Sequence, residues 1–220
     1  VEEKPMWKLL VDMPPQKIID AIDWRYLKDA LSKEEALKIL DEKIELHSDI
    51  EQEMLNKGPK AYSTAGWLGL TDSEISKVIQ DMKDQGFDCF KMKVGQNLDH
   101  DKERLSFIRR IIGDQSKLML DCNQLWGVDE AIEYMNELRD FNPVWIEEPT
   151  ARDDVQGHLK ISNALKDLNI KVASGEQVPS PVIFKQLLQS GAIGFCQIDA
   201  SRLGGVNDVL AIILMAKKFK

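Results

Sequence analysis

From residue 60 onward, the chain alternates between short apolar runs and longer stretches in which apolar residues recur every three or four positions. In 71–85, for example, Ile75, Val78, Ile79 and Met82 fall on one face of a helix. The apolar runs have the length and composition of buried strands. The pattern predicts strands at 61–65, 88–94, 117–121, 144–147, 170–176 and 195–199, and helices at 71–85, 100–112, 128–140, 153–167, 181–190 and 206–218.

Regular alternation of this kind is typical of an α/β protein in which helices lie outside a parallel sheet. Length alone does not separate a doubly wound sheet from a barrel. No GxGxxG or Walker loop follows the first predicted strand. We therefore expect an incomplete TIM-type (β/α) barrel with about six βα units.

The first 57 residues carry a mostly helical pattern instead. Pro14 and Pro15 interrupt the first helical stretch, and Ser32 opens a capping box before a second one. The polar run 42–57 predicts a solvated helix, and Gly58-Pro59 predicts a turn after it. We place a domain boundary there, with 1–57 as one part and the partial barrel over 58–220 as the other.

Composition narrows the classes of function. The 220 residues are 43% hydrophobic and carry a net charge of -8, which argues against binding to nucleic acid or to an anionic membrane. No apolar run is long enough to cross a bilayer. The three cysteines lack metal-ligand spacing and predict reduced thiols. The chain begins at Val1 and stops at a basic helix end, so we expect it to be a fragment.

Two lysines, Lys91 and Lys93, stand two residues apart on the second predicted strand. Side chains at i and i+2 of a strand point to the same face, so both ammonium groups point to one place. Mutual repulsion disfavours the charged form, and a partly neutral lysine is able to act as a base near pH 7. The plainer alternative is a lysine pair that reaches solvent.

Carboxylates stand at the ends of the following strands. Asp121 ends the third, Glu147 the fourth, Glu176 the fifth and Asp199 the sixth. The active sites of parallel barrels lie at this end, and neighbouring strands are about 4.8 Å apart. Asp121, Glu147 and Glu176 are therefore expected to meet, and three carboxylates with room for water suit octahedral Mg2+. Each carboxylate taken alone is explained as well by a loop or helix-cap charge.

The combined pattern resembles the mandelate racemase-like branch of the enolase superfamily. The matching motifs are Lys91-Met92-Lys93, Asp121-Cys122-Asn123-Gln124, Trp145-Ile146-Glu147-Glu148-Pro149-Thr150, Gly175-Glu176, and Asp199 with Arg202-Leu203-Gly204-Gly205. Within that branch, Trp67-Leu68-Gly69 and the charged insert before the first strand look like the L-fuconate dehydratases and their animal mitochondrial relatives. The resemblance implies that 1–57 is the end of an α+β capping domain with a helical insert.

The resemblance also implies a hydro-lyase chemistry, with Mg2+ as the cofactor and a small sugar acid as the substrate. Asp121, Glu147 and Glu176 would hold the metal. Lys93 would remove the proton alpha to the carboxylate, and loss of the beta hydroxyl would give a 2-keto-3-deoxy acid. Lys91 would bind the substrate carboxylate and lower the pKa of Lys93, and Glu176 would also lie against the substrate. By the same resemblance we expect a mitochondrial location, or else a cytoplasmic one, and a possible homo-oligomer.

One family feature is missing from the sequence. The family's general acid is a histidine on a seventh strand that pairs with the aspartate matched by Asp199, and this chain stops before that strand. His47, His100 and His158 lie at no predicted strand end and are poor substitutes. A truncated, non-catalytic product is therefore one alternative. Racemisation or cycloisomerisation on the same site is another, and a Schiff-base aldolase is a weaker one because it leaves the three carboxylates unexplained.

Overall fold

The computed structural model describes residues 3–42 and 47–219. The chain forms two compact units. We call Lys60–Gly175 with Ser190–Gln197 the sheet unit. The helical unit comprises Val1–Pro59, Glu176–Gln189 and Ile198–Lys220. The sequence places a boundary beside the same Gly58-Pro59 turn, but its assignment of all of 58–220 to one domain stays a prediction.

The sheet unit contains six parallel strands in sequence order, each bonded to the next along the chain. This order confirms the predicted α/β fold and partial barrel. The strands are β1 (Ser63–Gly66), β2 (Cys89–Lys93), β3 (Lys117–Asp121), β4 (Pro143–Glu147), β5 (Lys171–Ser174) and β6 (Phe195–Cys196).

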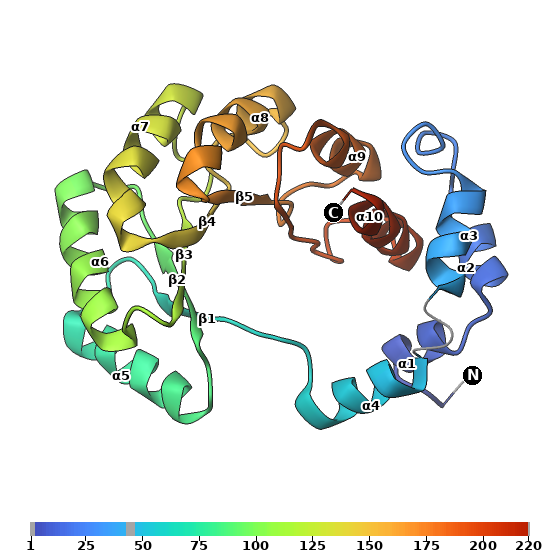
Figure 1. Cartoon of the computed structure of the whole chain (residues 1–220), viewed down its shortest axis with the longest axis horizontal. Helices are drawn as coiled ribbons and strands as arrows, with labels where there is room; N and C mark the ends of the chain where they lie inside the picture. The colour runs from blue at the N-terminus through green and yellow to red at the C-terminus, as the bar shows by residue number, and fades with distance from the viewer. Residues whose placement is uncertain (1–2, 43–46, 220) are drawn as a thin grey trace. The chain divides into compact units, whose positions relative to one another are not determined.

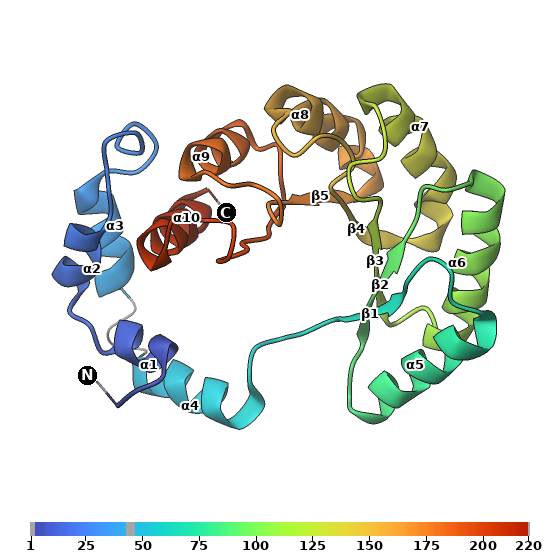
Figure 2. The same ribbon diagram turned by 180° about the vertical axis from the view of Figure 1, so that it is seen from behind.

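The helices α5, α6, α7 and α8 lie along the outer side of these strands in both views (Figure 1, Figure 2). Amphipathic spacing explains the packing, because Ile75 and Ile79 of α5 and Leu105 and Ile108 of α6 are all buried. Thr71 starts α5 through the capping box that its side chain forms with Glu74. The bounds are α5 Asp72–Asp84, α6 Leu98–Ile112, α7 Val128–Leu138 and α8 Val155–Ala164.

The inner face of the sheet carries the residues that prepare the site. Met119, Trp145 and Ala173 form a buried apolar cluster on β3, β4 and β5. Because side chains alternate along a strand, the next residues on this face are Asp121 and Glu147, at the strand ends. Buried apolar side chains therefore lie next to the charged side chains of Asp121 and Glu147 on this face of the sheet.

The helical unit contains α1 (Met6–Val11), α2 (Pro15–Ala21), α3 (Lys33–Asp41), α4 (His47–Lys57), most of α9 (Pro181–Ser190) and α10 (Val206–Lys218). The Ser32 capping box is confirmed at the start of α3. Two ion pairs join early and late segments of this unit, Lys185 with Asp29 and Lys218 with Glu35. Part of the predicted helix 42–57, namely 43–46, lies outside the described residues.

Several element boundaries differ from the prediction. Two short 3-10 turns, Arg139–Phe141 and Lys166–Leu168, follow α7 and α8, because Asn142 and Asn169 take left-handed conformations that stop the chain from continuing as a helix. The helix predicted from residue 100 begins at Leu98, capped by Asn97. The strand predicted over 195–199 is only Phe195–Cys196 long, with β5 as its sheet neighbour.

The structure also bears on the predictions about cysteines and membrane-spanning segments. All three cysteines are free thiols. Across residues 3–42 and 47–219, no helix combines the length and apolar character needed to cross a membrane.

Candidate functional site

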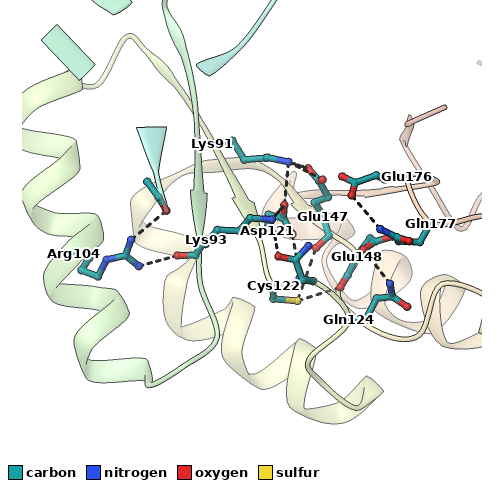
Figure 3. A network of polar contacts seen from close by, with 12 residues as sticks. Lys91, Lys93, Arg104, Asp121, Cys122, Gln124, Glu147, Glu148, Glu176 and Gln177 are labelled. Carbon is teal, nitrogen blue, oxygen red and sulfur yellow. Dashed lines mark hydrogen bonds and ion pairs between the residues drawn. The ribbon is translucent and has the colours of Figure 1, made fainter. Parts of the chain in front are cut away.

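The two lysines of β2 point to the same place, as their spacing predicts, and both are buried (Figure 3). Lys91 Nζ donates to both carboxylate oxygens of Glu147, at 2.7 and 2.8 Å, and lies 3.0 Å from Asp121 Oδ2. Lys93 Nζ donates to Asp121 Oδ2 and to Asn123 Oδ1, each at 2.6 Å. The ends of β2, β3 and β4 thus form one buried network of alternating charge.

Strand register accounts for this convergence. Lys93 pairs with Asp121 across β2 and β3, and Asp121 pairs with Glu147 across β3 and β4. Side chains at paired positions of parallel strands leave the same face, so three charged groups far apart in sequence become neighbours. The prediction that strand-end carboxylates lie beside the lysine pair is met for Asp121 and Glu147.

The charge balance at Lys91 differs from what simple repulsion between two lysines predicts. Burial disfavours its ammonium form, but the hydrogen bond to Glu147 and the charges of Asp121 and Glu147 outweigh burial and raise the pKa of Lys91. Sequence reasoning considered the repulsion between the two lysines but not the effect of the neighbouring carboxylates on the pKa of Lys91. A role for Lys91 in lowering the pKa of Lys93 stays a prediction.

The two carboxylates are perturbed in opposite directions. Burial works against ionisation of Asp121, yet the hydrogen bond from Lys93 and the charge of Lys91 hold its pKa below the usual range. Burial raises the pKa of Glu147 above its usual value, against the opposing hydrogen bond from Lys91. Neighbouring groups whose pKa values are pushed apart in this way are typical of sites that move protons.

Two amide side chains belong to this network and were not singled out as its members from the sequence. Asn123 accepts from Lys93, and its own backbone N–H donates to Asp121 Oδ1 at 3.0 Å. Its φ of 49° lies in the left-handed region, which asparagine tolerates better than most residues. Gln197 bonds the Glu147 carboxylate. For Asn123, the available signal was an asparagine two residues after a strand-end aspartate; for Gln197, the sequence held no such signal.

The remaining predicted residues lie in the helical unit. Glu176 follows Ser174, the end of β5, by two residues, and its Oε1 accepts a hydrogen bond from Gln177 Nε2 at 3.3 Å. Asp199 lies three residues beyond the short β6, not on it. Its Oδ1 accepts from Ser201 Oγ at 2.6 Å, and this hydrogen bond holds the pKa of Asp199 below its usual range. The roles of Glu176 and Asp199 stay predictions.

The histidines occupy helices. His47 begins α4, and His158 is buried within α8. His100 lies in the first turn of α6, where the Asn97 side chain accepts from the His100 backbone N–H and caps the helix. These positions agree with the prediction that none of the three lies at a strand end.

The buried carboxylates of the network are candidate ligands for a divalent cation. Asp121 and Glu147 are both almost fully buried hard-oxygen donors at adjacent strand ends, which suits Mg2+. In the described part of the chain, no three His, Cys, Asp or Glu side chains gather as a ready metal site. Instead, the ammonium groups of Lys91 and Lys93 compensate the two carboxylates. The pair fits a cation, and a third ligand would have to come from beyond it.

Comparison with known proteins places this geometry in a family. Residues 74–220 match the enolase C-terminal domain-like family. The chain is 48% identical over 220 residues to human mitochondrial enolase superfamily member 1, with 100% of this chain and 50% of the human protein covered. The crystal structure of the human protein matches with a TM-score of 0.95, covering 98% of this chain and 49% of that chain.

Two further relatives are named for acid-sugar dehydration. L-galactonate dehydratase from Hypocrea jecorina is 45% identical over 220 residues, covering 98% of this chain and 49% of that protein. The structure of L-talarate/galactarate dehydratase from Salmonella typhimurium LT2, liganded with Mg and L-lyxarohydroxamate, is 34% identical with a TM-score of 0.66, covering 72% of this chain and 40% of that one.

This chain spans about half the length of the curated relatives that it matches. The family match nevertheless extends over most of the chain and includes the strands that carry Lys91, Lys93, Asp121 and Glu147. The chain therefore belongs to the enolase C-terminal domain-like family of the enolase superfamily.

Proposed function

We propose that this chain carries the metal-binding and proton-abstracting half of an Mg2+-dependent acid-sugar dehydratase. The observation that carries the proposal is the buried network of Lys91, Lys93, Asp121 and Glu147 at neighbouring strand ends. Charged groups are costly to bury, so a buried cluster of them calls for a functional explanation. The carboxyl end of the parallel strands, where this cluster lies, is also where the active sites of barrels are found. The dehydratase names of two relatives support the same chemistry.

In this proposal Lys93 is the base and Lys91 binds the substrate. Lys93 Nζ takes the proton from the carbon next to the substrate carboxylate, a proton that is only weakly acidic. Lys91 meets the substrate carboxylate with its positive charge. Asp121, Glu147 and Glu176 would hold Mg2+, which supplies further positive charge where the carboxylate becomes more electron-rich. Departure of the beta hydroxyl completes formation of the 2-keto-3-deoxy acid.

The substrates we propose are L-fuconate and L-galactonate. L-fuconate differs from L-galactonate only in lacking the hydroxyl on carbon 6, so both present the same configuration at the reacting carbons. The 45% identity to L-galactonate dehydratase supports this class. Asp199 is proposed to orient a histidine that donates its own proton to the beta hydroxyl, which then leaves as water. The names of three animal relatives support a mitochondrial location. Subcellular fractionation of cells that express the native gene would test it.

The direct test incubates the full-length gene product, which would include the general acid, with each sugar acid and measures the 2-keto-3-deoxy product. We expect product with L-fuconate or L-galactonate in Mg2+, loss of product when EDTA removes the metal, and recovery when Mg2+ is restored. Product formation that is insensitive to EDTA would contradict the metal's role. Exchange of the alpha proton without any keto acid would replace dehydration by a racemase-type reaction on the same site.

A further inference from the structure

We propose that Trp67 forms one wall of the substrate site, where its ring lies against the carbon-bound hydrogens of an open-chain sugar acid beside Lys93. The inference deepens the proposed function and rests on it. Trp67 follows β1 directly, and the Lys93 ammonium lies 5.2 Å from the centre of the Trp67 ring. The lysine is buried, whereas the tryptophan is 55% exposed. A large aromatic ring thus covers the proposed base and still offers surface to a ligand.

The backbone at Trp67 is held by the same side chain that holds Lys93. Arg104 of α6 is buried, and its Nη1 donates to the Lys93 carbonyl oxygen at 2.8 Å. Its Nη2 donates to the carbonyl oxygens of Gly66 and Trp67, at 3.2 and 3.3 Å. A planar guanidinium offers several donors in a fixed geometry, so it couples the ends of β1 and β2 (Figure 3).

Arg104 is itself fixed from behind. Asp101, fully buried on the same helix, lies 3.6 Å from Arg104 Nη1 through its Oδ1. Its other oxygen accepts from the Gly95 backbone N–H at 2.6 Å and from the Tyr134 hydroxyl at 3.0 Å. A buried charge with this many partners resists rearrangement. The backbone that carries Trp67 is therefore held in place beside the end of β2.

The pairing register of β1 with β2 brings Trp67 alongside Lys93. Gly66 pairs with Met92, so the following residue, Trp67, comes alongside Lys93. A side-chain carbon at residue 66 would lie only 1.6 Å from Met92 Cε, so glycine at this position leaves room for the end of the Met92 side chain. A register shift between Ser63 and Gly66 accompanies the contact, which is why counting along the strand did not assign Trp67 to the site.

The neighbouring aromatic residue has a different role. The ring of Tyr62 lies 5.3 Å from the Lys91 ammonium, but it packs edge-on against Trp145, with 5.6 Å between ring centres. Trp145 in turn contacts Phe195, which extends the apolar stack. Tyr62 therefore belongs to a packed aromatic stack, and Trp67 is the better placed of the two to meet a ligand. An indole face suits the alternating C–H groups of a sugar chain and excludes water from the proposed base.

The test compares Trp67→Ala and Trp67→Phe with the matched control Trp7→Ala, which removes another half-exposed tryptophan, on α1. Alpha-proton exchange of L-fuconate and L-galactonate is followed by NMR in deuterated buffer with Mg2+. Binding is followed by intrinsic fluorescence. We expect Trp67→Ala to raise KM about tenfold with a smaller change in kcat, which is the size of a lost aromatic contact. Trp67→Phe should recover most of the affinity.

The fluorescence change on ligand binding should persist in Trp7→Ala and disappear in Trp67→Phe. An unchanged KM and an unchanged fluorescence response in the Trp67 variants would overturn this inference and leave the proposed function standing. A fall in kcat alone would also overturn it, because the ring would then act only through Lys93. Absence of exchange in the unaltered protein, with any substrate tried, would overturn the proposed function and this inference together.

Discussion

Asp121 forms ion pairs with both lysines of the site. It is fully buried and lies within 3.0 Å of both Lys91 Nζ and Lys93 Nζ. The sequence predicts that both lysines share a face, because their two-residue spacing is local information. It does not predict which carboxylate neutralises which lysine, because those partners lie 28 and 56 residues away and meet only through strand register.

Replacing Asp121 by asparagine should destabilise the protein in the absence of metal. Two buried ammonium groups would then share the single carboxylate of Glu147, and removing one partner of a buried ion pair costs about 3 kcal/mol or more. Urea unfolding in EDTA measures the loss. The matched control is Asp129→Asn, whose pair with Lys160 is well exposed, and it should change stability by less than about 1 kcal/mol. Equal losses of stability in Asp121→Asn and Asp129→Asn would contradict the proposed importance of Asp121 for the two buried lysines.

At the scale of elements, the helix α6 joins the ends of β1 and β2. Its apolar periodicity predicts a helix, and the structure confirms one. The inward direction of Arg104 could not be read from the pattern, because arginine on an amphipathic helix usually faces solvent. The length of β6 was overestimated for a related reason. Strand propensity is local, whereas the length of a strand depends on how many neighbours pair with it.

Arg104→Lys should weaken the attachment of α6 to the strand ends. A lysine keeps the charge but lacks the fork that reaches the carbonyl oxygens of Lys93, Gly66 and Trp67. We expect the unfolding free energy to fall by about 2 kcal/mol, since hydrogen bonds to a charged group are worth more than neutral ones. Chemical denaturation of Arg110→Lys, on the same helix, provides the control and should differ from the unaltered protein by less than about 0.5 kcal/mol. No difference between the two variants would contradict the proposed attachment.

For the whole molecule, the sequence predicts the order of the sheet well. Each strand is followed by a helix that returns the chain to the end of the sheet where the strands begin. Consecutive strands therefore run parallel and become neighbours. Lys91, Lys93, Asp121 and Glu147 lie together because of that order. Glu176 and Asp199 follow the last two strands and belong to the helical unit. Strand pairing brings the ends of β2, β3 and β4 together, but it does not determine the positions of residues that lie beyond the strands.

The most direct test of the proposed chemistry is exchange of the substrate's alpha proton with deuterated solvent, measured by NMR with Mg2+ present. Exchange needs the base and the metal but not the general acid. We expect Lys93→Ala to slow exchange at least about 100-fold, the usual contribution of a positioned base, while Mg2+ binding measured by calorimetry is retained. Lys102→Ala, which removes an exposed lysine paired with Glu137, should exchange at the unaltered rate. Exchange that persists in Lys93→Ala would contradict the assignment of Lys93 as the base.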